Sequence, residues 1–147
     1  MYLIAYFSAE GNTKRVAMEL NKVLNADVYE IEPKVKYTKE DLNWMDKNSR
    51  SSVEMKNKSS RPEIVKKDLD MSKYDKIYLG FPIWWYTAPT IINTFLESYD
   101  FDNKTVILFA TSGGSKWGKT VEDLKVSASK TVFVKGKVNP KDFTWVN

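Results

Sequence analysis

Short hydrophobic runs alternate along this chain with longer stretches in which apolar and polar residues mix. The hydrophobic runs cover residues 2–7, 76–80, 105–111 and 131–134, and a weaker run at residues 27–31 has Val28 and Ile31 as its apolar members. Nearly continuous apolar runs of this length are typical of strands in a parallel sheet that is covered on both faces. The pattern therefore predicts an α/β fold with five strands and right-handed crossovers between them.

Helices are expected in three of the mixed stretches, at residues 14–24, 88–98 and 116–126. In the first stretch Val16, Leu20, Val23 and Leu24 recur at spacings of three and four, which predicts one buried stripe. Helices connecting parallel strands wind onto both sheet faces. We therefore expect a layered, doubly wound architecture.

A long polar stretch, residues 32–60, interrupts the alternation and has few large apolar residues. Residues 38–41 (Thr-Lys-Glu-Asp) resemble a capping box and predict a short helix that ends at Trp44. Ser51 or Ser52 is expected to start another helix before Met55. No second hydrophobic core can be built from this stretch, so we interpret residues 1–147 as a single domain with an excursion.

The chain ends soon after its fifth hydrophobic run. Asn139 and Pro140 offer a helix N-cap and a proline at the first helical position, which predicts a shortened C-terminal helix. Such a helix would leave part of one sheet face bare. A partner or a homodimer contact on that face is therefore a hypothesis.

Composition excludes several kinds of chemistry. The 147 residues include no cysteine and no histidine, which removes disulfides, thiolate nucleophiles, imidazole bases and the usual zinc ligands, so no metal site is expected. The net charge is +4, but acidic and basic residues are interspersed, so no nucleic-acid partner is expected. No apolar run approaches the roughly 20 residues that span a bilayer, and a signal segment is lacking, which favours a cytoplasmic location.

Residues 8–13 (Ser-Ala-Glu-Gly-Asn-Thr) link the first strand directly to the first helix. A helix N-terminus presents unpaired backbone N–H groups and a partial positive charge, so it can hold a phosphate. Ser8 and Thr13 add hydroxyl groups, and Gly11 allows close approach of the backbone. A simple capped turn explains the same residues equally well.

Two further loops follow the third and fourth predicted strands. The first contains Trp84, Trp85 and Tyr86, whose flat rings can stack on a planar heterocycle or can fill the core or a subunit contact. The second, residues 111–115, is small and rich in N–H donors. Ligands of doubly wound sheets bind outside the carboxyl ends of the strands, where these loops and residues 8–13 meet. Together the three loops predict a site for a nucleotide-like cofactor.

Three motifs in this order resemble the flavodoxin-like family of small FMN proteins. They are Ser8-x-x-Gly-Asn-Thr-x-x-x-Ala17, Gly80-x-Pro-x-Trp-Trp85 followed by Pro89, and residues 111–114 (Thr-Ser-Gly-Gly). The resemblance implies a three-layer αβα flavodoxin-like fold, a five-stranded parallel sheet of order 2-1-3-4-5 and non-covalent FMN.

Residue by residue, the resemblance assigns each loop a part of the cofactor. The residues that would hold the phosphate are Ser8, Glu10, Gly11, Asn12 and Thr13. Those that would line the ribityl chain and the ring are Pro82, Ile83, Trp84, Trp85 and Tyr86. Those that would close the polar edge of the ring are Thr111, Ser112, Gly113 and Gly114. Lys14 and Arg15 are expected to face solvent.

The chain departs from the family pattern in two ways. Electron-transfer flavodoxins are typically acidic, whereas this chain is net positive, which argues against docking on the usual basic reductases. Residues 83–86 contain no glycine, and a positive φ is disfavoured at such residues. Family members with a glycine in this loop can flip a peptide group to donate to the reduced flavin. The resemblance therefore implies no such flip in this chain and a preference for two-electron chemistry.

The resulting hypothesis is an FMN-binding flavoprotein, acting in electron transfer or as an NAD(P)H/quinone-type oxidoreductase. The cofactor would carry the chemistry, which fits the absence of histidine and cysteine and leaves no side chain as catalytic residue. Its partner would be a redox protein or a small acceptor such as a quinone. The alternative is a non-catalytic flavodoxin-fold binding or regulatory module.

Other enzymes of similar topology fit poorly. A low-molecular-weight phosphatase needs a cysteine, a phospho-receiver domain needs an aspartate where this chain has Gly80, and a Walker-type hydrolase needs a lysine followed by serine or threonine after its glycine loop.

Overall fold

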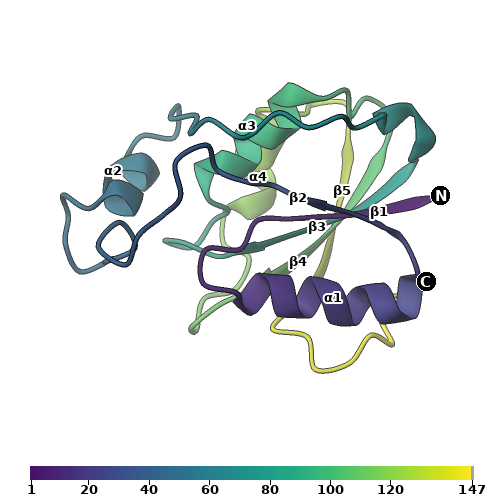
Figure 1. Cartoon of the computed structure of the whole chain (residues 1–147), viewed down its shortest axis with the longest axis horizontal. Helices are drawn as coiled ribbons and strands as arrows, with labels where there is room; N and C mark the ends of the chain where they lie inside the picture. The colour runs from purple at the N-terminus through teal and green to yellow at the C-terminus, as the bar shows by residue number, and fades with distance from the viewer. Residues whose placement is uncertain (147) are drawn as a thin grey trace.

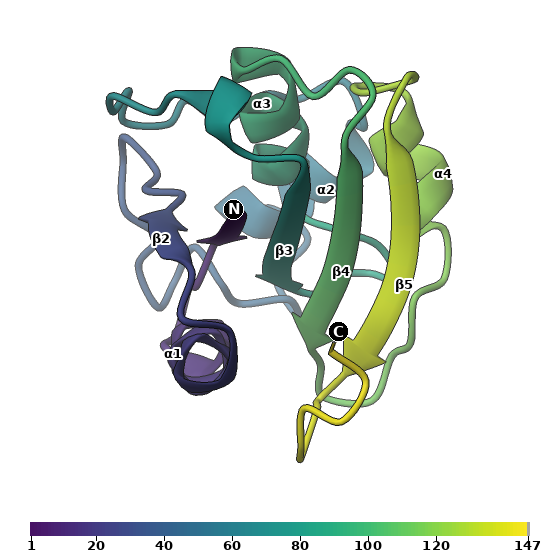
Figure 2. The same cartoon turned by 90° about the vertical axis from the view of Figure 1, so that its right-hand side faces the viewer.

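Five parallel strands form the centre of the molecule in the order β2-β1-β3-β4-β5 (Figures 1 and 2). The computed structural model describes residues 1–146. The strands are β1 (Tyr2–Tyr6), β2 (Asp27–Glu30), β3 (Lys76–Pro82), β4 (Thr105–Thr111) and β5 (Val132–Val138). This sheet confirms the predicted flavodoxin-like α/β fold and its strand order.

Helices cover both faces of the sheet and make it the middle of three layers. Helix α1 (Asn12–Leu24) lies on one face, and α3 (Thr90–Ser98) and α4 (Thr120–Lys125) lie on the other (Figure 2). Helix α2 (Arg50–Lys56) belongs to the excursion, and a 3-10 turn (Met71–Lys73) leads into β3. In the described part of the chain, every helix is too short or too polar to cross a lipid bilayer.

The two sheet faces have separate hydrophobic cores because successive side chains of a strand point to opposite faces. In β1, Leu3 and Ala5 pack in the larger core below α3 and α4, whereas Ile4 and Tyr6 pack against α1. The buried stripe of α1 includes Val16 and Leu20 as predicted. Its other buried members are Thr13 and Ala17. Val23, which was predicted to be buried, is mostly exposed.

The excursion contains one helix rather than two. Thr38 and Asp41 do form the reciprocal backbone-to-side-chain hydrogen bonds of a capping box, but residues 38–44 contain turns and no helix. The predicted helix ending at Trp44 is therefore wrong, since the capped turn is not continued by successive helical hydrogen bonds. Helix α2 is present, but its N-cap is Ser49 and not Ser51 or Ser52.

The predicted shortened C-terminal helix is also wrong, because residues 139–146 contain turns and no helix. This tail nevertheless covers part of the sheet face beside α1. Phe143, Trp145 and Val146 pack against the smaller core, and the Trp145 ring lies 6.4 Å from that of Tyr78. The part of this face that the sequence suggested was bare is therefore covered in part by side chains of an irregular tail.

Candidate functional site

A cleft of about 670 Å³ lies at the carboxyl ends of β1, β3 and β4. Nine of the predicted site residues line it: Glu10, Asn12, Pro82, Ile83, Trp84, Trp85, Thr111, Ser112 and Gly113. Five others lie on the same loops but do not line it: Ser8, Gly11, Thr13, Tyr86 and Gly114. The strand order thus brings together three loops that are far apart in the sequence.

The loop before α1 is organised by Ser8 and Gly11. Ser8 Oγ accepts hydrogen bonds from the N–H groups of Gly11, at 3.0 Å, and Lys14, at 3.1 Å. Gly11 has a φ of 94°, in the left-handed region that favours glycine. Within residues 1–146 the N–H groups of Asn12 and Thr13 have no protein acceptor. The first turn of α1 therefore presents two backbone donors and the positive end of a 13-residue helix.

Thr13 connects this loop to the end of β4. Its side chain is 1% exposed, and its hydroxyl lies 2.8 Å from the hydroxyl of Thr111. The Thr111 carbonyl accepts a hydrogen bond from the N–H of Ile83. Thr111 is thus linked to both of the other loops and fixes their relative positions.

Residues 84–87 form a tight two-residue hairpin turn. Trp84 and Thr87 exchange both backbone hydrogen bonds, at 2.9 and 3.2 Å. The two central residues, Trp85 and Tyr86, have φ values of 48° and 64°, as a type I′ turn requires. The expectation that non-glycine residues would avoid positive φ here is wrong, because the closed turn imposes this geometry. The backbone of this turn therefore gives no reason to expect a preference for two-electron chemistry.

The turn is supported from the loop after β4 by Gly118 and Lys119. The Lys119 N–H donates to the carbonyl of Tyr86 at 3.1 Å. Gly118 has a φ of 50°, and a Cβ placed on it would lie 2.1 Å from that same carbonyl oxygen. A glycine is therefore required here both by conformation and by space.

Of the two tryptophans in this turn, Trp84 also has a structural role. Its ring packs edge-on against Phe7, with centroids 5.7 Å apart, and against Tyr37, at 5.5 Å. Trp85 is 43% exposed and lines the cleft, and among residues 1–146 its ring makes no such ring contact. Trp84 thus packs in the core and also forms part of the cleft wall, whereas the ring of Trp85 is more accessible to a ligand.

Asn139, which the sequence reading did not single out as a site residue, fixes the loop after β4. Its side-chain amide donates to the Ser112 carbonyl at 2.8 Å and accepts from the Ser112 N–H at 2.9 Å. Ser112 Oγ accepts from the N–H of Gly114. In the described chain, the Gly113 N–H has no such partner and remains a donor in the cleft wall. From the sequence, Asn139 had been identified only as a helix N-cap candidate before Pro140.

The excursion and α1 supply further wall residues that the sequence reading missed. Leu42 and Trp44 come from the excursion, Pro140 and Lys141 come from the tail, and Arg15, which was expected to face solvent, also lines the cleft. A tryptophan within an otherwise polar stretch was the available signal for Trp44.

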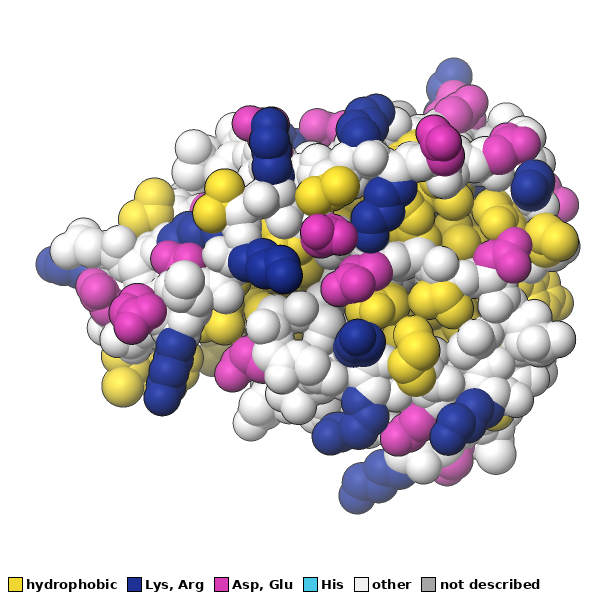
Figure 3. Space-filling model, in the orientation of Figure 1, with side chains coloured by type: hydrophobic (Ala, Val, Ile, Leu, Met, Phe, Trp, Pro, Cys, Tyr) yellow, Lys and Arg dark blue, Asp and Glu magenta, His cyan; other side chains and the backbone are white. Residues whose placement is uncertain are grey.

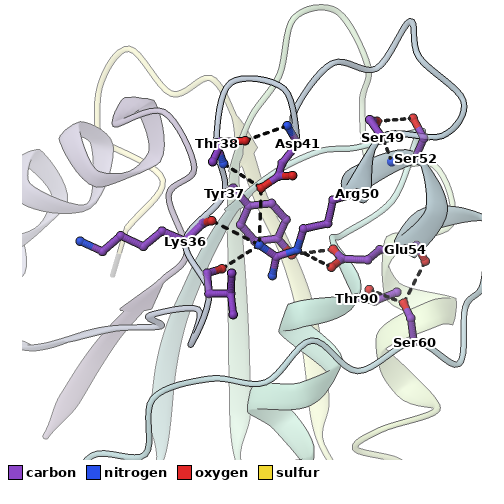
Figure 4. A network of polar contacts seen from close by, with 11 residues as sticks. Lys36, Tyr37, Thr38, Asp41, Ser49, Arg50, Ser52, Glu54, Ser60 and Thr90 are labelled. Carbon is purple, nitrogen blue, oxygen red and sulfur yellow. Dashed lines mark hydrogen bonds and ion pairs between the residues drawn. The ribbon is translucent and has the colours of Figure 1, made fainter.

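Arg50 holds the excursion in place (Figure 4). Its guanidinium donates to the Val35 carbonyl at 2.7 Å and to Glu54 at 3.0 Å, and it lies 3.8 Å above the Tyr37 ring. Burial, followed by the hydrogen bond to Glu54, raises the pKa of the Tyr37 hydroxyl well above its ordinary value. This network connects α2 to the segment that precedes Leu42 and Trp44.

The cleft has the features that a phosphorylated cofactor with a flat ring requires. Its volume lies within the roughly 300–1,000 Å³ typical of ligand sites. Backbone donors of α1 stand at one end, and the tryptophans Trp44, Trp84 and Trp85 provide aromatic surface. The residues present therefore fit such a group.

The chain resembles one family along nearly its whole length. The family profile described as Flavodoxin matches residues 1–145. The fold of this chain is similar to that of a candidate flavoprotein from Bacteroides uniformis. The two sequences are 49% identical, the TM-score is 0.88, and the match covers 93% of this chain and 88% of the other. A candidate flavoprotein from Bacteroides eggerthii gives 44% identity, a TM-score of 0.88 and coverage of 94% and 87%.

A more distant neighbour carries a bound cofactor. The flavoprotein of Lactobacillus acidophilus, solved in complex with FMN, has 23% identity, a TM-score of 0.77 and coverage of 94% of this chain and 92% of that one. At this identity the likeness shows the fold alone. No curated protein matches the sequence.

Proposed function

Because this chain belongs to the flavodoxin family, we propose that it binds FMN non-covalently in the cleft and acts as an electron carrier or an FMN-dependent oxidoreductase. The single observation that carries the proposal is the meeting of an open helix N-terminus with an aromatic turn in one cleft. Bound FMN would supply reversible electron or hydride transfer, for which the side chains of this protein offer no substitute.

The phosphate is assigned to residues 8–13. The free N–H groups of Asn12 and Thr13 and the positive end of α1 would bind its oxygens. Ser8 holds the loop in shape through Gly11 and Lys14 and would act by positioning. Arg15, which lines the cleft from the first turn of α1, adds positive charge at this end.

The ring is assigned to the space between the turn at residues 84–87 and the loop after β4. Trp85 would pack on it, and the Gly113 N–H would donate to its polar edge. Pro82, Ile83 and Trp84 would exclude water from one side, while Trp44 would cover the ring from the excursion. Thr111, Ser112 and Gly114 support this arrangement through hydrogen bonds within the protein.

Titrating the cofactor-free protein with FMN and with riboflavin tests the assignment directly. FMN is expected to bind much more tightly than riboflavin, because only FMN has the phosphate, and to raise the midpoint of thermal unfolding. If FMN does not raise the unfolding midpoint, the result would instead favour the alternative of a non-catalytic binding or regulatory module. A protein that binds both flavins equally would refute the phosphate assignment.

Asn12→Asp sharpens this test without disturbing the core. Asn12 is exposed, and a carboxylate at the first position of α1 favours the helix but repels a phosphate. We expect FMN affinity to fall roughly 10- to 100-fold, the loss typical of a charged hydrogen bond, while riboflavin affinity stays unchanged. Asn103→Asp, between α3 and β4 at the opposite end of the sheet, makes the same charge change and is expected to leave both affinities unchanged.

The carrier and the enzyme differ in their partners. Oxidation of NAD(P)H by the FMN-loaded protein with a quinone as acceptor would identify an oxidoreductase. If the FMN-loaded protein instead exchanges electrons with a redox protein, in either direction, and shows no such turnover, it is a carrier. The basic net charge favours an acidic protein partner or an anionic small molecule in either case.

A further inference from the structure

Exposed hydrophobic side chains gather where the excursion meets the aromatic turn. Trp44 and Met45 are 71% and 76% exposed, and both line a small pocket together with Trp85. Figure 3 shows hydrophobic side chains at the surface on the left, over the segment that carries α2. Several large apolar side chains exposed side by side indicate a binding surface.

This small pocket, named here the side pocket, adjoins the cleft and has a volume of about 170 Å³. Trp44 and Trp85 line both spaces, so a ligand in the side pocket would lie next to the ring end of the cleft. Met45 and Met55 complete its apolar lining. Methionine side chains adapt to flat ligands of different outline, and indole rings stack on aromatic ones.

The charged residues of the side pocket are all basic. Lys47 and Lys56 line it, and no aspartate or glutamate does. The Lys56 ammonium donates to the carbonyl of Lys47 at 3.2 Å, which keeps it at the rim. In the described chain neither lysine forms an ion pair, and the nearby Asp46 carboxylate accepts from the Asn48 N–H. The pocket is therefore complementary to a negative charge.

We propose that the side pocket binds a flat aromatic anion beside the cofactor ring, with its ring against the parts of Trp44 and Trp85 that line this pocket and its acidic group at Lys47 and Lys56. This deepens the proposed function, on which it rests, by naming the chemical class of the second ligand. The aromatic walls supply affinity, and the two ammonium groups select a carboxylate or sulfonate over an uncharged ring.

The test uses two inert probes that differ in charge, naphthalene-2-sulfonate and uncharged 2-naphthalenemethanol. Both are titrated by calorimetry into the FMN-loaded protein and into the cofactor-free protein. We expect the sulfonate to bind at least five-fold more tightly, the ratio for one exposed ion pair of about 1 kcal/mol. Equal binding of the two probes would overturn the proposal.

Two variants separate the charge from the aromatic surface. Lys47→Gln combined with Lys56→Gln is expected to lower sulfonate affinity about ten-fold and leave 2-naphthalenemethanol unaffected. Trp44→Ala is expected to lower the affinity for both probes about ten-fold, since each stacking contact is of this size. Failure of either variant to weaken the sulfonate would contradict the assignment.

The matched control is Lys22→Gln combined with Lys130→Gln, which makes the same charge change near the amino ends of the strands. It is expected to bind the sulfonate as the unmodified protein does. An equal loss in this control would overturn the proposal by showing an effect of net charge alone. Thermal unfolding in the presence of FMN is measured on every variant, so a failure of FMN binding is seen separately from a failure of the side pocket.

Discussion

The hydroxyls of Thr13 and Thr111 lie 2.8 Å apart although 98 residues separate them in the chain. This contact joins the first turn of α1 to the carboxyl end of β4, and hence the phosphate end of the proposed site to its ring end. Thr13 is buried and Thr111 is half-buried in the cleft wall, so the contact lies at the edge of the cleft.

A double-mutant cycle measures this contact. Thr13→Val and Thr111→Val each remove one hydroxyl and keep the side-chain shape. Urea unfolding of the cofactor-free protein is expected to give a coupling free energy of about 0.5–1.5 kcal/mol, the usual net value of one hydrogen bond. Additive effects of the two substitutions would show that the contact contributes nothing.

Gly118→Ala is expected to destabilise the protein by more than about 1 kcal/mol, because the new Cβ would meet the Tyr86 carbonyl and φ is positive. The same variant should bind FMN more weakly, since the turn that carries Trp85 must shift. Gly114→Ala is the control, as a Cβ there meets nothing within 4 Å. Its free energy of unfolding should stay within about 0.5 kcal/mol of that of the unmodified protein.

Tyr86→Gly is expected to raise the free energy of unfolding by about 0.5–1 kcal/mol. Its φ of 64° is costly for tyrosine, and its exposed side chain loses little packing when removed. Val126→Gly, at an exposed residue with a φ of −58°, should instead lower stability. Urea unfolding of both variants checks this contrast, and a loss of stability in Tyr86→Gly would show that the turn is unstrained.

Arg50→Lys is expected to loosen the excursion while leaving the sheet intact. Lysine keeps the charge but cannot bond both Glu54 and the Val35 carbonyl as the guanidinium fork does. Hydrogen exchange of the excursion amides should accelerate about 10-fold or more, since each charged hydrogen bond is worth about 1.5–3 kcal/mol. The exposed ion pair of Lys34 with Glu63 provides the control, and Lys34→Gln should change exchange little. Unchanged exchange in Arg50→Lys would contradict this role.

Stability is expected to fall above about pH 10, where free tyrosine ionises. Burial raises the pKa of Tyr37 in the folded state, so the unfolded chain loses this proton first as pH rises. The stabilisation is complete below pH 10 and decreases above it. The hydrogen bond to Asp27 raises the pKa of Tyr74 to about 12, which acts in the same direction.

Tyr37→Phe removes one of these groups. The free energy of unfolding of this variant should fall less steeply between pH 10 and pH 11.5 than that of the unmodified protein, by up to about 1.4 kcal/mol per pH unit. Chemical unfolding across this range measures both slopes. Identical slopes would show that the buried hydroxyl of Tyr37 does not titrate differently in the two states.

The sequence was sufficient for the sheet because each strand carries its own hydrophobic run. Those runs, with the helical spacing of Val16 and Leu20, define a parallel sheet covered on both faces. The loops at its carboxyl ends then follow from topology, and nine of the predicted site residues lie in one cleft for that reason.

Local sequence patterns were less reliable where tertiary contacts determine the backbone conformation. The capping box at Thr38 did not produce a helix, and Pro140 did not start one. In the first case the segment is held by Arg50, and in the second the tail is anchored by packing of Phe143 and Trp145. Short helices form in proteins mainly through tertiary packing, so these local signals were insufficient.

The sequence alone thus determined the strands, the main helices and the three loops of the site, because these depend on periodicity and on turn chemistry within a few residues. Only the tertiary structure decided the positive φ of Trp85 and Tyr86, the support by Gly118 and Asn139, and the place of Trp44 in the cleft wall. Each of these depends on contacts between groups from distant parts of the chain, which form only when the sheet assembles. No local sequence pattern indicates such long-range contacts.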